Sequence, residues 1–164
     1  MAAKRLTEGG KAPAFSLTTA AGITVKLSDY RGRKIVLYFY PKDNTPGCTK
    51  EACSFQESLK VLEREGAVVL GVSCDSTASH QRFAEKFGLT FPLLSDPETS
   101  VAKAYGVYKQ KSMYGRTYWG IERTTFLIDE AGRIAKIFPK VQVDGHTQAV
   151  LDALRERHAA TVSS

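Results

Sequence analysis

The run IVLYFYP at Ile35–Pro41 joins β-branched, aromatic and leucine side chains without a polar break and ends at a proline. Continuous apolar runs of this length are typical of strands that are buried on both faces of a sheet. A second such run, AVVLGVS, stands at Ala67–Ser73. Between the two, apolar residues recur every three or four positions from Ala52 to Leu62, which predicts an amphipathic helix. The order strand, helix, strand favours an α/β fold with parallel neighbouring strands.

The remaining segments extend this alternation of strands and helices. Asp96, followed by Pro97 and Glu98, is typical of a helix start with Asp96 as the N-cap. The other expected elements are hairpins at 14–27 and 124–138, helices at about 79–87, 96–106 and from 144 onward, a short strand at 93–94, a loop at 109–120 and a loose tail at 159–164. We therefore predict a single domain over residues 1–164, with a mixed central β-sheet flanked by helices.

Composition and charge place the chain among ordinary globular proteins. Of its 164 residues, 43% are hydrophobic and 24% are charged, and the formal net charge is +6. The positive excess is concentrated at 103–123, where five cations stand against Glu122. Such a segment suits an anionic partner, but nucleic-acid-binding domains carry denser clusters of Lys and Arg. We therefore expect no nucleic-acid partner.

Targeting signals and cysteine content indicate a cytoplasmic protein. No apolar stretch follows the charged start of the chain, so a secretory signal is not predicted. The longest apolar run, Ile35–Tyr40, is far shorter than the ~20 residues of a membrane-spanning helix. Three cysteines are too few, and odd in number, for a secreted disulfide framework. We expect no membrane partner and thiols that are mostly reduced at rest.

The densest candidate for chemistry is the loop 41–47 together with Cys48, which begins the predicted helix. A cysteine at a helix N-terminus faces unpaired backbone N–H groups and the positive end of the helix dipole, and both stabilise a thiolate relative to a thiol. Thr45 stands three residues earlier and can direct its hydroxyl to the same place. The competing interpretation is that Cys48 is a small buried apolar residue, the usual role of an unpaired cysteine.

Four further residues leave alternatives open. Cys53 is close enough in sequence to condense with a sulfenic acid at Cys48, whereas Cys74 follows a buried strand and is expected to be inert. A zinc site built from the three cysteines and His80 matches no common zinc motif, so we predict no metal. His80 itself is expected on a helix surface. Arg123, at the start of a strand, is expected in solvent unless other residues draw it inward.

Several blocks of sequence together resemble one family. The segment Tyr38–Cys53, YFYPKDNTPGCTKEAC, contains the pattern Pro-x-x-x-Thr-x-x-Cys. It is similar to the peroxidatic motif of peroxiredoxins, in the form found in the bacterioferritin-comigratory-protein (peroxiredoxin Q) branch. Further blocks of that branch are matched in the same order at 71–80, 91–96, 111–116 and 123–129. The resemblance covers nearly the whole chain and implies a thioredoxin-like fold with an N-terminal β-hairpin.

The resemblance also implies roles for particular residues. Cys48 becomes the peroxidatic cysteine, and Thr45, Pro41 and Arg123 complete its site. Cys53 takes the position of the resolving cysteine of one subset of the branch, so that it would form an intramolecular disulfide with Cys48. The expected partners are a hydroperoxide substrate and thioredoxin as reductant, with glutaredoxin as the alternative. We expect a monomer that needs no cofactor.

The chemistry of these residues suits peroxide reduction. Cys48 supplies the nucleophile, and the planar Arg123 guanidinium can stabilise the thiolate and bind a peroxide oxygen. Thr45 Oγ1 and the backbone N–H groups of Gly47 and Cys48 are expected to donate to the reacting oxygens. Glu51, one turn after Cys48, could orient Arg123, although a solvated surface acid is an equally simple interpretation.

Two other classes of function compete with a peroxidase. A thiol–disulfide oxidoreductase would use the same thiols, but the Cys-x-x-Cys pattern of that chemistry is missing. A redox sensor or holdase would use oxidation of Cys48 to change partners rather than to turn over substrate. Peroxide consumption separates a peroxidase from both.

Overall fold

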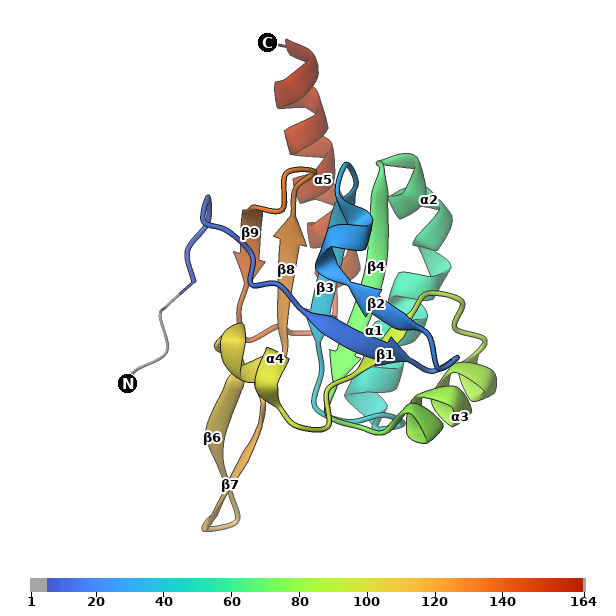
Figure 1. Ribbon diagram of the computed structural model, residues 1–164, viewed down its shortest axis with the longest axis vertical. Coiled ribbons are helices and arrows are strands. Elements are labelled where there is room, and N and C mark those ends of the chain that lie inside the picture. Colours follow the sequence, from blue (N-terminus) through green and yellow to red (C-terminus); the bar gives the residue numbers. More distant parts are fainter. Residues whose placement is uncertain (1–5, 164) are drawn as a thin grey trace.

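A mixed β-sheet forms the centre of the molecule. The computed structural model describes residues 6–163, with side chains for residues 6–156. The strands of the sheet in this part of the chain are β1 (Ser16–Thr19), β2 (Thr24–Lys26), β3 (Lys34–Phe39), β4 (Ala67–Ser73), β5 (Leu93–Ser95), β8 (Thr124–Ile128) and β9 (Ile134–Phe138). They lie in the order β2–β1–β5–β4–β3–β8–β9, with β3, β4 and β5 parallel and the other pairs antiparallel (Figure 1). The predicted mixed sheet and N-terminal hairpin are confirmed.

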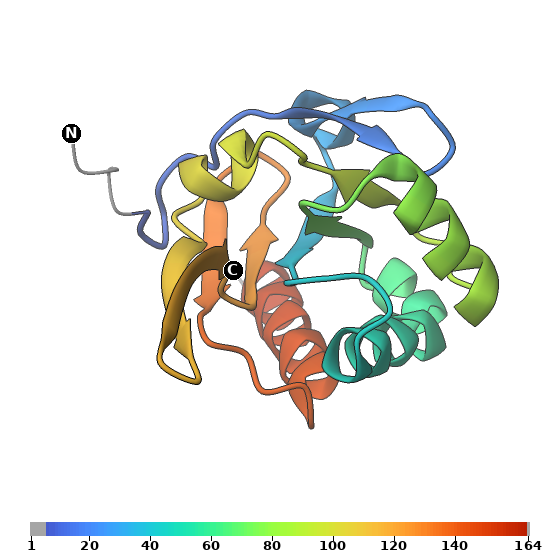
Figure 2. The same ribbon diagram turned by 90° about the horizontal axis from the view of Figure 1, so that it is seen from below.

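Helices cover both faces of this sheet. They are α1 (Pro46–Glu57), α2 (Leu59–Arg64), α3 (Thr77–Phe87), α4 (Ser100–Ala104) and α5 (His146–Ser163), with a 3-10 turn η1 (Leu27–Tyr30). From below, η1, the β1–β2 hairpin and α4 lie on one side, and α1, α2 and α5 lie on the other (Figure 2). Phe39 of β3 belongs to the apolar core on the α4 side, whereas Tyr38 belongs to the core on the α1 side. The apolar run at Ile35–Tyr40 is continuous because both of its faces are buried.

A close contact within the sheet determines where α1 packs. Tyr38 of β3 stands opposite Gly71 of β4 in the parallel register. A Cβ atom at Gly71 would lie 2.9 Å from Cζ of Tyr38, which is too close for a side chain, so glycine leaves room for the ring. The ring packs against Phe55 of α1, with 4.8 Å between the ring centroids. This contact holds α1 against the sheet, and the N-terminus of α1 follows the carboxyl end of β3 after a short loop.

Residues 109–120, predicted as a loop, belong to a hairpin outside the main sheet. β6 (Tyr108–Met113) pairs in antiparallel with β7 (Arg116–Ile121), and the hairpin extends away from the sheet (Figure 1). Tyr114 and Gly115 form its turn with positive φ angles of 53° and 77°, as a two-residue hairpin turn requires. The prediction is wrong because most of this hairpin is exposed on both faces, so its sequence lacks the apolar alternation of a half-buried strand.

The helix expected to begin at Asp96 begins four residues later. α4 starts at Ser100, after Thr99 with a φ of 62°. Asp96 still serves this helix, because its carboxylate accepts the backbone N–H groups of Val101 at 3.3 Å and Ala102 at 2.8 Å. The Asp96 carboxylate therefore accepts backbone N–H groups of the helix start, as predicted. A turn at 97–99 separates Asp96 from the helix, and the sequence pattern does not reveal that turn.

The loose tail expected at 159–164 is not found over 159–163. The backbone continues α5 to Ser163, and residue 164 lies outside the described part of the chain. Ala159 and Ala160 favour helix, and extending an existing helix costs far less than starting one. None of the described helices combines the length and the apolar character that crossing a membrane requires.

Candidate active site

Cys48 lies in the first turn of α1, where the loop from β3 enters the helix. Thr45 is the N-cap residue, Pro46 opens the helix, and the N–H of Thr49 donates to the Thr45 carbonyl at 2.8 Å. The Cys48 side chain is turned toward the sheet and is only 2% exposed. The predicted position at a helix start is confirmed. The sulfur therefore sits next to the unpaired N–H groups of the first turn.

Arg123 brings a positive charge to this sulfur. It stands between β7 and β8, and the pairing of Thr124 with Phe39 carries it to the carboxyl end of β3. Its Nη2 donates to Cys48 Sγ at 3.3 Å, and its Nη1 donates to Glu51 Oε1 at 2.6 Å. The thiol and the buried carboxylate draw the guanidinium inward, so Arg123 lies beside Cys48 as the family resemblance implies, and its side chain is only 17% exposed.

Glu51 is a buried acid held against Arg123, not a solvated surface residue. Its side chain is 1% exposed, and Oε2 has no hydrogen-bond partner among the described residues. Burial raises the pKa of Glu51 to about 7, although the charge and hydrogen bond of Arg123 act in the opposite direction. Burial also acts to lower the pKa of Arg123, but Glu51 and Cys48 outweigh it and raise that pKa, so the cation is retained.

Gly47 allows the close approach of the guanidinium. A Cβ atom at this position would lie 3.2 Å from Arg123 Nη2, tighter than ordinary van der Waals contact. From the sequence alone, Gly47 is expected only to supply a backbone N–H group. The contact was missed because it joins two segments that are 76 positions apart in the chain.

Thr45 and Pro41 occupy the loop before the helix. Thr45 Oγ1 donates its hydrogen to the Lys42 carbonyl at 2.9 Å and makes no capping bond to the helix. With its hydrogen directed to the Lys42 carbonyl, this hydroxyl can accept a further hydrogen bond. Its expected role as a donor toward the reacting oxygens stays a prediction. Pro41 is exposed at the start of the loop, and its expected shielding of the sulfur stays a prediction.

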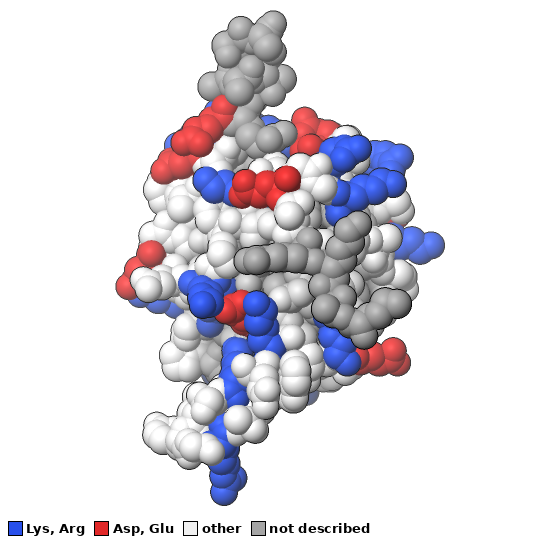
Figure 3. Space-filling model, turned by 90° about the vertical axis from the view of Figure 1, so that its left-hand side faces the viewer, with Lys and Arg blue, Asp and Glu red and all other residues white. Residues whose placement is uncertain are grey.

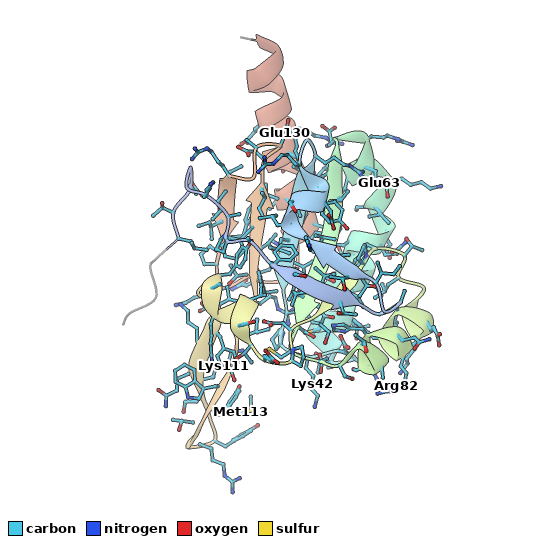
Figure 4. All side chains as sticks on the ribbon, in the orientation of Figure 1. Lys42, Glu63, Arg82, Lys111, Met113 and Glu130 are labelled. Atoms are coloured by element: carbon cyan, nitrogen blue, oxygen red, sulfur yellow. The ribbon has the colours of Figure 1, made fainter. Side chains whose placement is uncertain are left out.

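The β6–β7 hairpin adds a second cation. Lys111 donates from Nζ to the Ile121 carbonyl, at the base of the hairpin (Figure 4). Burial and the nearby Arg123 lower the pKa of Lys111, while Glu122 and Cys48 act in the opposite direction. Lys and Arg side chains line the hairpin (Figure 3). The excess charge noted in the sequence at 103–123 therefore lies partly beside the sulfur.

The other two thiols lie in different surroundings, and all three cysteines are free. Cys53 is half-buried on α1, where burial and the Glu57 carboxylate raise its pKa. Cys74 follows β4, and burial together with Asp96 and Asp75 raises its pKa to about 11. The charges that act on these two thiols are carboxylates, whereas the charge that contacts Cys48 is the Arg123 guanidinium.

His80 is fully buried, so its predicted surface position is wrong. It lies against Asp43, and the proposed zinc ligands are not brought together. Among the described residues, the group close enough to share a metal ion is Asp43, Asp75 and His80, without a cysteine. These three side chains already make hydrogen bonds within the protein. Both ring nitrogens of His80, Oδ2 of Asp43 and Oδ2 of Asp75 each have a partner.

Comparison with known proteins identifies the family. Residues 9–137 match the AhpC/TSA family. The putative peroxiredoxin bcp of Coxiella burnetii is 53% identical over 146 residues, which cover 89% of this chain and 97% of that protein. The chain belongs to the AhpC/TSA family, among the Bcp peroxiredoxins. The predicted resemblance is confirmed, and this peroxiredoxin is a thiol peroxidase.

Solved structures agree with this family. A PrxQ mutant of Xylella fastidiosa matches the peroxiredoxin with a TM-score of 0.90 and 41% identity, over 94% of this chain and 99% of that one. The bacterioferritin comigratory protein of Xanthomonas campestris matches with a TM-score of 0.83 and 43% identity, over 87% and 91% of the two chains. The thioredoxin-like peroxiredoxin fold is therefore confirmed.

Proposed function

We propose that this peroxiredoxin reduces hydrogen peroxide and organic hydroperoxides with Cys48, resolves the oxidised sulfur with Cys53 and is reduced again by thioredoxin. The observation that carries the proposal is the 3.3 Å contact between Arg123 Nη2 and Cys48 Sγ in a buried site. The related Xanthomonas campestris protein is reported to have alkyl peroxide reduction activity, which supports organic hydroperoxides as substrates here.

In the first step the Cys48 thiolate attacks the terminal oxygen of the hydroperoxide. An S–O bond forms, the O–O bond breaks, and the leaving oxygen takes a proton from solvent to give water or an alcohol. Arg123 is placed to stabilise both the thiolate and the charge that develops on the leaving oxygen. Thr45 Oγ1 can accept the O–H of the substrate and so orient it. The protein product is a sulfenic acid on Cys48.

In the second step the Cys53 thiol displaces hydroxide from the Cys48 sulfenic acid, which yields a disulfide and water. Both cysteines lie on α1. In an ideal helix the Cα atoms of two residues five positions apart, such as Cys48 and Cys53, are ~8.7 Å apart. A disulfide needs a Cα–Cα distance of about 4.4–6.8 Å. The first turns of α1 must therefore unwind, which withdraws Cys48 from Arg123.

Amide hydrogen exchange tests the unwinding step. We expect weaker protection across Thr45–Phe55 in a sample fully bridged between Cys48 and Cys53 than in the reduced protein, because the helix start opens. The β1–β2 hairpin, whose buried residues belong to the core on the other face of the sheet, should exchange equally in both states and serves as the internal control. Equal protection across Thr45–Phe55 in the two states would contradict the unwinding.

In the third step a dithiol protein reduces the disulfide by thiol–disulfide exchange and is itself oxidised. We propose thioredoxin as this reductant, with glutaredoxin as the alternative, and a monomeric peroxidase as the working unit. An unwound helix start would present the disulfide to such a partner, because Cys53 is already half-exposed in the reduced form.

Peroxide-dependent oxidation of NADPH, coupled through thioredoxin and its reductase, tests the whole cycle. The wild type should turn over with hydrogen peroxide and with an alkyl hydroperoxide, and Cys48→Ser should show no turnover above the background without enzyme. A parallel assay with glutathione and glutaredoxin identifies the reductant. Full activity of Cys48→Ser, or reduction of insulin disulfides in place of peroxide, would contradict the proposal.

A further inference from the structure

A buried polar cluster lies directly behind the loop that leads to Cys48, and the peroxide chemistry does not use it. Its centre is the Asp43 carboxylate, which accepts hydrogen bonds from Tyr40 Oη at 2.6 Å and from Ser79 Oγ at 2.8 Å. His80 Nδ1 lies 2.7 Å from the same carboxylate. The backbone N–H of Asp43 donates to Asp75 Oδ2 at 2.8 Å. One loop residue is thus tied to two strand ends and to the first turns of α3.

The contact between Asp43 and His80 is close and buried, with 2.7 Å between Oδ2 and Nδ1. His80 is fully buried, and its Nε2 lies 3.0 Å from the Leu94 carbonyl. The ring thus lies between two hydrogen-bond acceptors, a carbonyl and a carboxylate. Burial would raise the pKa of Asp43, but hydrogen bonds from His80, Tyr40 and Ser79 outweigh it and hold that pKa below its ordinary value. The carboxylate is therefore ionised in the folded protein.

This pair anchors the loop at a point close to the catalytic groups. Asp43 stands two residues before Thr45 and five before Cys48. Its neighbour Lys42 points out of the molecule (Figure 4), whereas Asp43 points inward. Asn44 then turns the chain with a φ of 59°. The start of α1 has no side-chain cap of its own, so its position depends on where the loop before it is held.

We propose that Asp43 and His80 are positioning residues for the peroxide reaction, and that their buried contact holds the loop 41–45 so that Cys48 and Thr45 stay aligned with Arg123. The inference rests on the proposed role of Cys48. A displacement of reacting groups by about 1 Å can cost about a hundredfold in rate, so a loop anchored by a buried pair has a direct kinetic consequence. A purely structural role would affect stability without changing the reaction of the folded protein.

The test measures the reaction of the reduced protein with hydrogen peroxide in a single turnover, in Asp43→Ala, Asp43→Asn, His80→Gln and the double variant Asp43→Asn/His80→Gln. The same samples are alkylated with iodoacetamide, which needs a thiolate but no aligned peroxide. Asp96→Asn is the matched control, because Asp96 is an equally buried aspartate that accepts backbone N–H groups away from Cys48. Asp43→Asn keeps the shape of the side chain, so it serves if Asp43→Ala does not fold.

We expect the single variants to slow the peroxide reaction by about tenfold or more, while alkylation of Cys48 slows by less than about threefold. The double variant should lose less than the product of the two single losses, since both break one interaction. Asp96→Asn should react with peroxide like the wild type, whatever its stability.

Three outcomes would overturn the inference: variants that react at the wild-type rate, a fall in alkylation that matches the fall in peroxide reaction, or an equal loss in Asp96→Asn. In each of these cases the wild type still reacts, so the proposed function stands. A wild type that is alkylated but does not react with peroxide would overturn the proposed function and this inference with it.

Discussion

Cys48 and Cys74 follow neighbouring parallel strands, β3 and β4, and so lie near the same edge of the sheet. Their electrostatic surroundings are opposite. Cys48 is almost fully buried and receives a hydrogen bond from the Arg123 guanidinium. Cys74 is half-buried, and the carboxylates of Asp96 and Asp75 add to the effect of burial in raising its pKa to about 11.

From this comparison we expect the charge beside a thiol to matter more for its reactivity than its exposure. On exposure alone, Cys74 would be the better target, since peroxide reaches it more easily. A thiolate is the reacting form, however, and nearby carboxylates disfavour it while a guanidinium favours it. The Arg123 guanidinium therefore lies beside Cys48, the less accessible of the two sulfurs.

Replacing the guanidinium should produce the largest loss. Arg123→Lys keeps a positive charge but removes the planar set of donors that contacts both Cys48 and Glu51. We expect the rate constant for reaction with hydrogen peroxide to fall by about a hundredfold, as measured in a single turnover by stopped flow. Lys109→Arg, a change of cation on the exposed hairpin, is the control. A rate within threefold of wild type in Arg123→Lys would show that charge alone suffices.

Gly47→Ala should produce a smaller loss by displacing the same guanidinium. The added methyl group would lie 3.2 Å from Arg123 Nη2, so the side chain must move away from Cys48 or the helix start must shift. We expect the same rate constant to fall by about tenfold. Gly120→Ala, where a Cβ atom meets its nearest neighbour at 3.6 Å, is the matched control and should react normally. Equal rates in the two variants would contradict the close approach.

The Glu51 carboxylate, which is buried beside Arg123 near Cys48, should make the stability of the protein depend on pH. Its pKa rises from 4.5 to about 7 on folding, so the folded state binds more protons than the unfolded state in that range. Stability from this group is full below about pH 4.5 and is lost as the pH rises toward 7. Glu51→Gln lacks this loss.

The measurement is the free energy of unfolding of Glu51→Gln minus that of wild type, from denaturant titrations between pH 4.5 and 8. The difference should shift in favour of the variant as the pH rises to 7, by at most about 3 kcal/mol, and then level off. Loss of the bond to Arg123 adds an offset that does not alter this trend. A difference that is constant with pH would contradict burial of an acid with a raised pKa.

Cys74→Ser should produce the smallest effect. No catalytic contact joins Cys74 to Cys48 in the described structure, and its surroundings disfavour the thiolate. We expect peroxide turnover with thioredoxin within about threefold of wild type. A loss approaching that of Cys48→Ser would mean that the electrostatic comparison selects the wrong sulfur.

Sequence patterns predicted those parts of the structure that depend on local periodicity or on local chemistry. The buried strands and the helix start at Cys48 are of this kind. The placement of Arg123 beside that sulfur joins residues 75 positions apart and was expected only from the family resemblance. The exposed β6–β7 hairpin has no apolar alternation, so no periodicity revealed it. His80 looked like a surface residue because its partner Asp43 is 37 positions away, and only the folded chain brings them together.

The most direct test of the charge argument locates the first oxidation by peroxide. Reduced Cys53→Ser protein, in which the sulfenic acid cannot be resolved by Cys53, is treated with one equivalent of hydrogen peroxide in the presence of dimedone. Peptide mass spectrometry then measures the adduct on each cysteine. We predict at least about ten times more adduct on Cys48 than on Cys74. Equal labelling, or more on the half-buried Cys74, would contradict the claim that the neighbouring charge decides which thiol reacts.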